Sequence, residues 1–224
     1  VILDFDDYHY TTINDAEIQK RQIDFNLGAG IVLFNHLQMG ISYQIPAKKC
    51  YIQNLAFTIT DDCNLDCYHC LRGKKCKNII SDDVIIKTLK QVCGIGNLAI
   101  DGGEPTLAVD RIETIIYYVI ENNIRLDEFT ITINGTIYSE KLLELLEQIN
   151  NYIAKDSINA YFAISVDDYH LDEIERLGIT KEFKENLVKY MESKYFIGFR
   201  NTDKKFFREG NAVNLDNKLT VPLR

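Results

Sequence analysis

Short apolar, β-branched runs alternate with stretches of helical apolar spacing along most of the chain after residue 54. Each run predicts a strand, and each stretch between two runs predicts a helix. The predicted strands span residues 55–60, 98–100, 129–133, 161–166, 195–199 and 218–221. The first predicted helix begins at Ser81 and has an apolar face that extends to Val92. Three further helices are predicted at residues 110–122, 139–149 and 180–191. This alternation is typical of βαβ units around a parallel sheet.

The number of predicted strands limits how far such a sheet can close. A complete eight-stranded barrel needs about 250 residues, and the whole chain has 224. The alternation suits a (β/α) barrel or a doubly wound sheet, and at most six strands follow residue 54. We therefore predict an α/β fold, an incomplete and open parallel (β/α)6 barrel over residues 54–224, preceded by an N-terminal extension over residues 1–53.

The extension is predicted to be partly helical. Asn14–Glu17 has the spacing of a helix cap, with Asn14 as the capping residue. The apolar spacing through Ile31 and Leu37 is also roughly helical, with glycines at Gly28 and Gly30 that interrupt it.

Composition excludes several classes of protein. The 13 tyrosines and 11 phenylalanines supply enough apolar area for a core, which argues against global disorder. No apolar run approaches the roughly 20 residues that cross a bilayer. The net charge of −8 disfavours a nucleic-acid partner. The first residues are acidic and no apolar signal region follows them, so a cytoplasmic location is expected.

Three of the six cysteines, Cys63, Cys67 and Cys70, fall on one loop after the first predicted strand. In a reducing compartment clustered cysteines bind metal or do redox chemistry, and thiolates select iron–sulfur clusters, zinc or copper(I). Three thiolates on a four-iron cube leave one iron open. The alternative is a closed zinc site completed by Cys76, which would make the chain a structural or interaction module.

Further polar motifs follow the later predicted strands, where active sites of parallel sheets gather. Gly102-Gly103-Glu104-Pro105 would let a backbone approach a ligand closely and place a carboxylate near its amino group. Asn134 follows the third strand, and Ser165 and Asp167 end the fourth. Each also has a plainer interpretation as a turn, a cap or a surface residue. His170 has no partner at ligand spacing and receives no role.

Cys63-x3-Cys67-x2-Cys70, with His69 before the last cysteine and Gly102-Gly103-Glu104-Pro105 downstream, resembles the radical S-adenosylmethionine (radical SAM) family. The resemblance covers roughly residues 54–200. It implies that the three cysteines hold a [4Fe–4S] cluster whose open iron binds the amino and carboxylate groups of SAM. It further implies that His69 lies near the adenine of SAM and that Gly102, Gly103 and Glu104 contact its amino group. Ser165 would contact the ribose or the carboxylate, and Arg176 would help to hold the carboxylate.

The resemblance also implies an activity. An electron from the reduced cluster would cleave SAM to methionine and a 5′-deoxyadenosyl radical, which abstracts hydrogen from a substrate. A low-potential electron donor such as flavodoxin or ferredoxin would be the redox partner. The stretch 208–212 faintly resembles a Gly-Arg-Ala segment of the peptide-modifying branch, with Asn211 as a departure, and this favours a peptide or protein substrate. A small-molecule substrate and the activation of a glycyl-radical enzyme are the alternatives. No second cluster motif follows, so either one cluster suffices or a C-terminal part is missing.

Overall fold

The computed structural model of the chain describes residues 49–73, 75–154, 156–201 and 210–215, together with the backbone of four strands at 26–33, 37–44, 206–207 and 220–221. The chain divides into two compact units, Val1–Lys48 and Lys49–Arg224, and each is described by itself.

The described part of the first unit is a hairpin. Strand β1 (Asn26–Leu33) pairs antiparallel with β2 (Leu37–Gln44). The helical spacing predicted through Ile31 and Leu37 is therefore wrong. Apolar residues alternate with other residues in this segment, and a period of two places them on one face of a strand. The helix predicted to start at Asn14–Glu17 lies outside the described residues.

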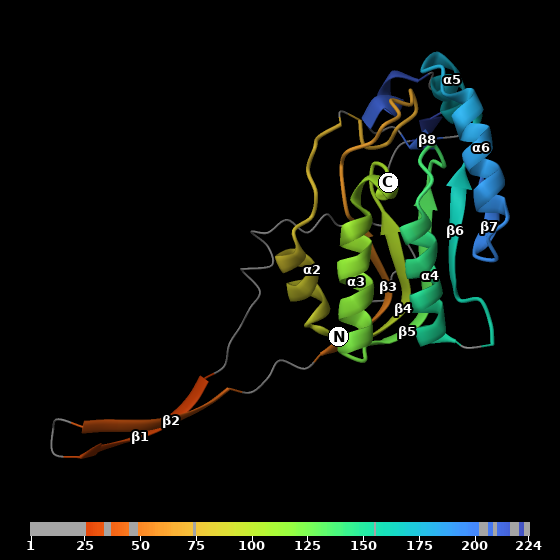
Figure 1. Cartoon of the computed structure of the whole chain (residues 1–224). Helices are drawn as coiled ribbons and strands as arrows, with labels where there is room; N and C mark the ends of the chain where they lie inside the picture. Colours follow the sequence, from red (N-terminus) through yellow and green to blue (C-terminus); the bar gives the residue numbers. More distant parts are fainter. Residues whose placement is uncertain are drawn as a thin grey trace. The chain divides into compact units, whose positions relative to one another are not determined.

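The second unit is built on a sheet of five parallel strands in the order in which they occur along the chain (Figure 1). They are β3 (Cys50–Thr58), β4 (Val92–Asp101), β5 (Arg125–Ile133), β6 (Ala160–Ser165) and β7 (Phe196–Arg200). A doubly wound sheet reverses its strand order at one point, and this sheet does not. The predicted α/β fold is confirmed, as an open partial barrel.

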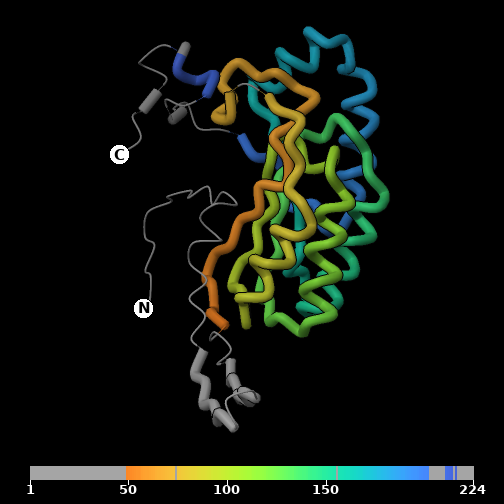
Figure 2. The backbone as a smooth tube through the Cα atoms, turned by 90° about the vertical axis from the view of Figure 1, so that its left-hand side faces the viewer, coloured from red at the N-terminus to blue at the C-terminus, as the bar shows by residue number. Residues whose placement is uncertain are grey.

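Three α-helices each connect two successive strands of this sheet, and two more lie between β6 and β7. They are α2 (Asp82–Leu89), α3 (Val109–Glu121), α4 (Glu140–Ile153), α5 (Asp168–Arg176) and α6 (Thr180–Met191). Serine side chains start two of them, because Ser81 accepts from the N–H of Val84 at 3.4 Å and Ser139 from that of Leu142 at 3.2 Å. Helices α2, α3 and α4 cover one face of the sheet, as two perpendicular views show (Figure 1, Figure 2).

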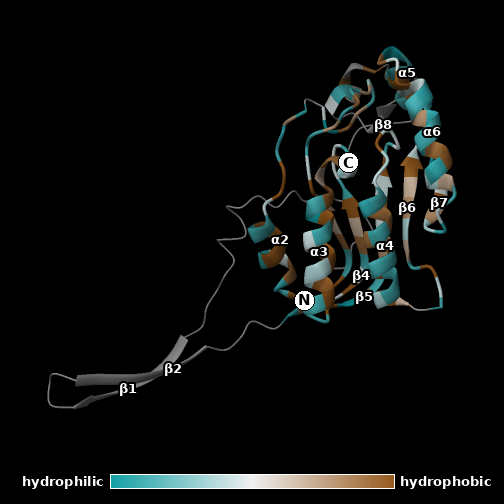
Figure 3. Cartoon of the chain, viewed as in Figure 1, coloured by the Kyte–Doolittle hydropathy of each residue, from teal (hydrophilic) through white to brown (hydrophobic). Residues whose placement is uncertain are grey.

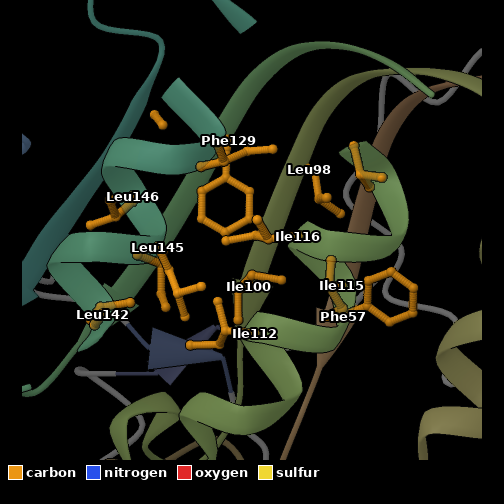
Figure 4. Close-up of a cluster of buried hydrophobic side chains, with 14 of the residues drawn as sticks. Phe57, Leu98, Ile100, Ile112, Ile115, Ile116, Phe129, Leu142, Leu145 and Leu146 are labelled. Carbon is orange, nitrogen blue, oxygen red and sulfur yellow. The ribbon is translucent and has the colours of Figure 1, made fainter. Parts of the chain in front are cut away.

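The core lies between that helical layer and the sheet. Strand β4 is predominantly hydrophobic, and the outer surface of α4 is largely hydrophilic (Figure 3). Ile112, Ile115 and Ile116 of α3 and Leu142, Leu145 and Leu146 of α4 pack against Leu98, Ile100 and Phe129 of the strands (Figure 4). All of these side chains are at most 1% exposed, so a rigid platform supports the loops at the carboxyl ends of the strands.

Two of the predictions differ from the structure in the element or sheet to which the residues belong. Val92 was expected on the first helix, but α2 ends at Leu89 and Val92 begins β4. The strand predicted at residues 218–221 is present as β9 (Thr220–Val221), which pairs with β8 (Phe206–Phe207) rather than with the five-stranded sheet. Within the described residues, no helix has both the length and the apolarity that crossing a bilayer requires.

Candidate metal and cofactor site

The cysteine loop runs from the carboxyl end of β3 over the end of the sheet. Cys63, Cys67 and Cys70 contact one small apolar cluster that includes Leu65 and Phe183. Burial raises the pKa of the Cys67 thiol to about 12, and the charges of Cys63 and Cys70 act in the same direction. All three thiols therefore share one largely apolar environment. A positively charged metal centre would offset this cost by stabilising the thiolates, so the donor set fits an iron–sulfur cluster.

The cysteine that would close an all-thiolate zinc site is placed differently. Cys76 is exposed. The apolar cluster around the other three thiols does not include it.

Gly102 and Gly103, which follow β4, lie directly against the cysteine loop. A Cβ on Gly103 would lie 2.1 Å from the carbonyl oxygen of Asp62, and one on Gly102 would lie 2.8 Å from that of Thr60. The N–H of Gly103 donates to Thr60 at 2.7 Å, and that of Glu104 donates to Asp62 at 2.8 Å. These N–H groups hold the cysteine loop. The contact of Gly102 and Gly103 with SAM stays a prediction.

The Glu104 carboxylate is buried behind the loop. Oε1 accepts from the N–H of Thr106 at 3.1 Å and its hydroxyl at 2.6 Å, and Oε2 accepts from the N–H of Asn134 at 2.7 Å. Burial raises the pKa of Glu104, and these hydrogen bonds oppose the rise. Both oxygens are therefore already engaged, Oε1 by Thr106 and Oε2 by Asn134 at the end of β5. The predicted contact of Glu104 with the amino group of SAM remains untested.

Asn134, for which a plain turn was the favoured interpretation, is buried beside Cys63. Its side-chain amide lies 2.8 Å from Oδ1 of Asn64 and 3.9 Å from Sγ of Cys63. The N–H of Leu65 donates to the same sulfur at 3.4 Å. Hydrogen bonds to the sulfur ligands of an iron–sulfur cluster raise the reduction potential of the cluster. The sequence offers no signal for this network, because Asn64 and Asn134 are 70 residues apart.

His69 and Ser165 line one cavity of about 510 Å³ at the ends of β6 and β7. The cavity is completed by Asp167, His170, Phe199, Arg200 and Asn201. Two of the residues that were predicted to contact SAM are thus brought together. Arg200 adds a cation to this cavity that the sequence did not single out.

Asp167 lies between two histidines. Its Oδ2 is 3.3 Å from Nε2 of His69, and its Oδ1 is 2.8 Å from Nδ1 of His170. The two imidazole rings meet edge to face with centroids 5.0 Å apart, and His69 also stacks on Tyr169 at 4.8 Å. The expectation that His170 has no partner is wrong, because α5, which was not predicted as a helix, begins after Asp167 and brings His170 back to the loop.

Arg176 lies apart from His69 and Ser165. Its guanidinium donates to both oxygens of Glu173, at 2.7 and 2.8 Å, and lines a second cavity of about 280 Å³ with Tyr68. Glu173 in turn accepts from the N–H of Asp66 in the cysteine loop at 2.9 Å. The observed role of Arg176 is to orient a carboxylate that holds the loop, and its contact with SAM stays a prediction.

A late segment of the chain, η2 (Gly210–Asn214), also supports the cysteine loop. The N–H of Asn211 donates to the carbonyl of Cys70 at 2.8 Å, and its side-chain amide donates to that of Cys67 at 3.2 Å. Gly210 has a φ of +53°, and a Cβ there would lie 2.2 Å from the carbonyl of Leu71. The residue that departs from the Gly-Arg-Ala pattern is therefore one that binds the loop.

The amino-acid sequence is similar to those of known proteins. The profile described as the radical SAM superfamily matches residues 57–198. A probable GTP 3′,8-cyclase of Methanothermobacter thermautotrophicus is 29% identical over 141 residues, which are 58% of this chain and 43% of that protein. One from Methanococcus maripaludis strain C6 is 31% identical over 108 residues, 44% of this chain and 35% of that protein. The chain thus spans less than half the length of these relatives.

Two solved structures are also similar. One is native anSMEcpe with bound AdoMet and Cp18Cys peptide, at 17% identity and a TM-score of 0.41, covering 71% of this chain and 53% of that one. The other is Streptococcus suis SuiB bound to precursor peptide SuiA, at 18% identity and a TM-score of 0.41, covering 70% and 40%.

Proposed function

The chain belongs to the radical SAM superfamily, and from this premise we propose that Cys63, Cys67 and Cys70 ligate a [4Fe–4S] cluster that binds SAM. When bound and reduced, such a cluster supplies the electron that cleaves SAM to methionine and a 5′-deoxyadenosyl radical. The observation that carries the proposal is the placement of three thiols in one apolar cluster on a single loop. The turn after β4, helix α5 and η2 all hold this loop by hydrogen bonds.

The residues of the chain position this chemistry. Gly103 and Glu104 fix the backbone of the loop before its first cysteine, and Asn211 fixes it at the last two. The cavity lined by His69 and Ser165 would receive the nucleoside of SAM. Phe199 and Arg200 also line this cavity and would face the substrate, because they end the last strand of the sheet.

We infer that the substrate is a peptide or protein. Among the strands that the structure describes, β7 pairs only with β6, so its outer edge offers backbone N–H and C=O groups. An extended peptide can add to such an edge by main-chain hydrogen bonds. Ile197 and Phe199 are both about half exposed on this strand, and a peptide laid along it would reach the cavity at Phe199.

A nucleotide is the second candidate. The relatives named GTP 3′,8-cyclase favour it, and the Arg200 guanidinium in the cavity is a suitable partner for a phosphate.

We place the enzyme in the cytoplasm, where a flavodoxin or ferredoxin would supply the low-potential electron and oxygen-sensitive clusters persist.

The test uses anaerobically reconstituted protein with dithionite and SAM. We expect formation of 5′-deoxyadenosine, which Cys67→Ala abolishes together with bound iron, while the exposed-thiol control Cys76→Ala retains both. Intact SAM with the parent protein, or iron loss in Cys76→Ala but not in Cys67→Ala, would contradict the ligand assignment.

The substrate class is tested in the same assay. The peptide fraction of a cell extract and GTP are offered separately, and the 5′-deoxyadenosine formed above the substrate-free level is measured. Stimulation by the peptide fraction supports our choice, whereas stimulation by GTP alone refutes it.

A further inference from the structure

A second set of metal-ligating side chains lies beside the cysteine loop and shares only Cys67 with the cluster ligands. Ligand atoms of Cys67, His69 and His170 all lie within 4.8 Å of one another. In a tetrahedral zinc site, bonds of about 2.0–2.3 Å place ligand atoms roughly 3.3–3.8 Å apart. The three ligand atoms are therefore at most about 1.0–1.5 Å farther apart than a bound tetrahedral ion would hold them.

Asp167 makes this set more than a chance meeting of side chains. Metal-ligating histidines commonly direct their second ring nitrogen to a carboxylate, which fixes the orientation of the ring. Asp167 is 6% exposed and contacts one nitrogen of each imidazole, Nε2 of His69 and Nδ1 of His170. If Asp167 keeps these contacts, Nδ1 of His69 and Nε2 of His170 are the nitrogens left to ligate an ion.

The backbone fixes the carboxylate in this position. Asp167 is the N-cap of α5, and its Oδ1 accepts from the N–H of His170 at 3.0 Å. The distance between Asp167 and the imidazole of His170 is therefore determined by a helix start rather than by a mobile loop.

We propose that, in protein without the iron–sulfur cluster, Cys67, His69 and His170 bind a single divalent transition-metal ion of the zinc type. One thiolate and two imidazoles are donors that such ions accept, and three protein ligands leave a fourth position for water. Binding replaces the thiol proton of Cys67 with the metal, and that proton is released to solvent.

The same ion would compete with the cluster, because both need the sulfur of Cys67. This competition rests on the proposed function, whereas the mononuclear site does not. A zinc-type ion at Cys67 would keep the protein from assembling its cluster. The choice of metal would then decide whether the protein is active.

The test uses Co²⁺ alone, added anaerobically to cluster-free protein, with absorption spectroscopy as the readout. We expect one bound equivalent with a thiolate-to-cobalt charge-transfer band and tetrahedral d–d bands, which Zn²⁺ abolishes. The Cys63→Ala/Cys70→Ala double variant keeps this spectrum. The tetrahedral bands are lost in His170→Ala and also in His170→Gln, whose side chain is closer in size to histidine. His170→Gln still reconstitutes iron to the level of the parent.

Three results would overturn the proposal. The first is the absence of tetrahedral cobalt bands in the parent. The second is the loss of these bands in the double cysteine variant, and the third is their persistence in both His170 variants. Far-ultraviolet circular dichroism identifies any variant that has not folded, and His170→Gln then decides in place of His170→Ala. Failure of the proposed function has a different signature, since it is the absence of SAM cleavage in the iron-loaded parent.

Discussion

Replacement of Glu104 by glutamine preserves the size of a buried side chain but removes one of its acceptors. Every group that contacts the Glu104 carboxylate is a donor in the structure: the N–H and hydroxyl of Thr106 at Oε1 and the N–H of Asn134 at Oε2. An amide has one oxygen and one NH₂ group. In either orientation of the substituted amide, therefore, one backbone N–H faces a second donor.

The magnitude follows from that count. Leaving one buried donor without an acceptor costs about 1–3 kcal/mol. Removal of the charge returns part of the desolvation cost that raises the pKa of Glu104. We therefore expect Glu104→Gln to lower the free energy of unfolding by about 1–2 kcal/mol, measured by urea denaturation of the cluster-free protein at about pH 7.5.

The matched control is Glu144→Gln, a change of the same chemistry at an exposed position of α4. It should change the free energy of unfolding by at most about 0.5 kcal/mol. If Glu104→Gln is as stable as this control, the carboxyl is protonated or its bonds to Thr106 and Asn134 do not hold the strand ends together, and the reasoning fails.

Two other changes test the supports of the cysteine loop. Gly103→Ala places a Cβ 2.1 Å from the carbonyl oxygen of Asp62 and should break the two hydrogen bonds that Gly103 and Glu104 donate. We expect the free energy of unfolding in urea to fall by about 2–3 kcal/mol. The control is Gly178→Ala, whose Cβ would have no atom within 4 Å and which should cost only the roughly 1–2 kcal/mol of a left-handed conformation. The hydrogen bond from Arg176 lowers the pKa of Glu173 below its ordinary 4.5, which stabilises the fold above that value and is lost as pH falls through the lowered one. Arg176→Ala should therefore be less stable than the parent at about pH 7 and converge with it in acid; an equal difference at both pH values would refute this linkage.

Much of the fold could be predicted from apolar spacing. The interiors of β3 to β7 and of α2, α3, α4 and α6 lie where the alternation placed them, because long apolar periods reflect burial against one core. The hairpin was misread because its glycines and a coincidental helical spacing outweighed the alternation of Leu27, Ala29 and Ile31 in the interpretation. Helix α5 was missed because only two of its side chains, Glu173 and Ile174, are buried, so it carries little periodic signal.

The site was predictable in part for a related reason. Residues adjacent in sequence, such as the three cysteines or Gly102–Glu104, form motifs that spacing reveals. The groups that support them come from distant positions, as Asn134, Glu173 and Asn211 do. No local pattern marks an asparagine that donates to the cysteine loop from 144 residues away, and only the folded chain identifies it.

The bonds from Asn211 to the carbonyls of Cys67 and Cys70 have a consequence for biosynthesis. A ribosome translates the thiol-bearing loop well before it reaches residue 211. A growing chain therefore presents these thiols while their final restraint has yet to be synthesised. On the proposed function, delivery of iron and sulfide to a fully shaped loop would wait until translation has passed that asparagine.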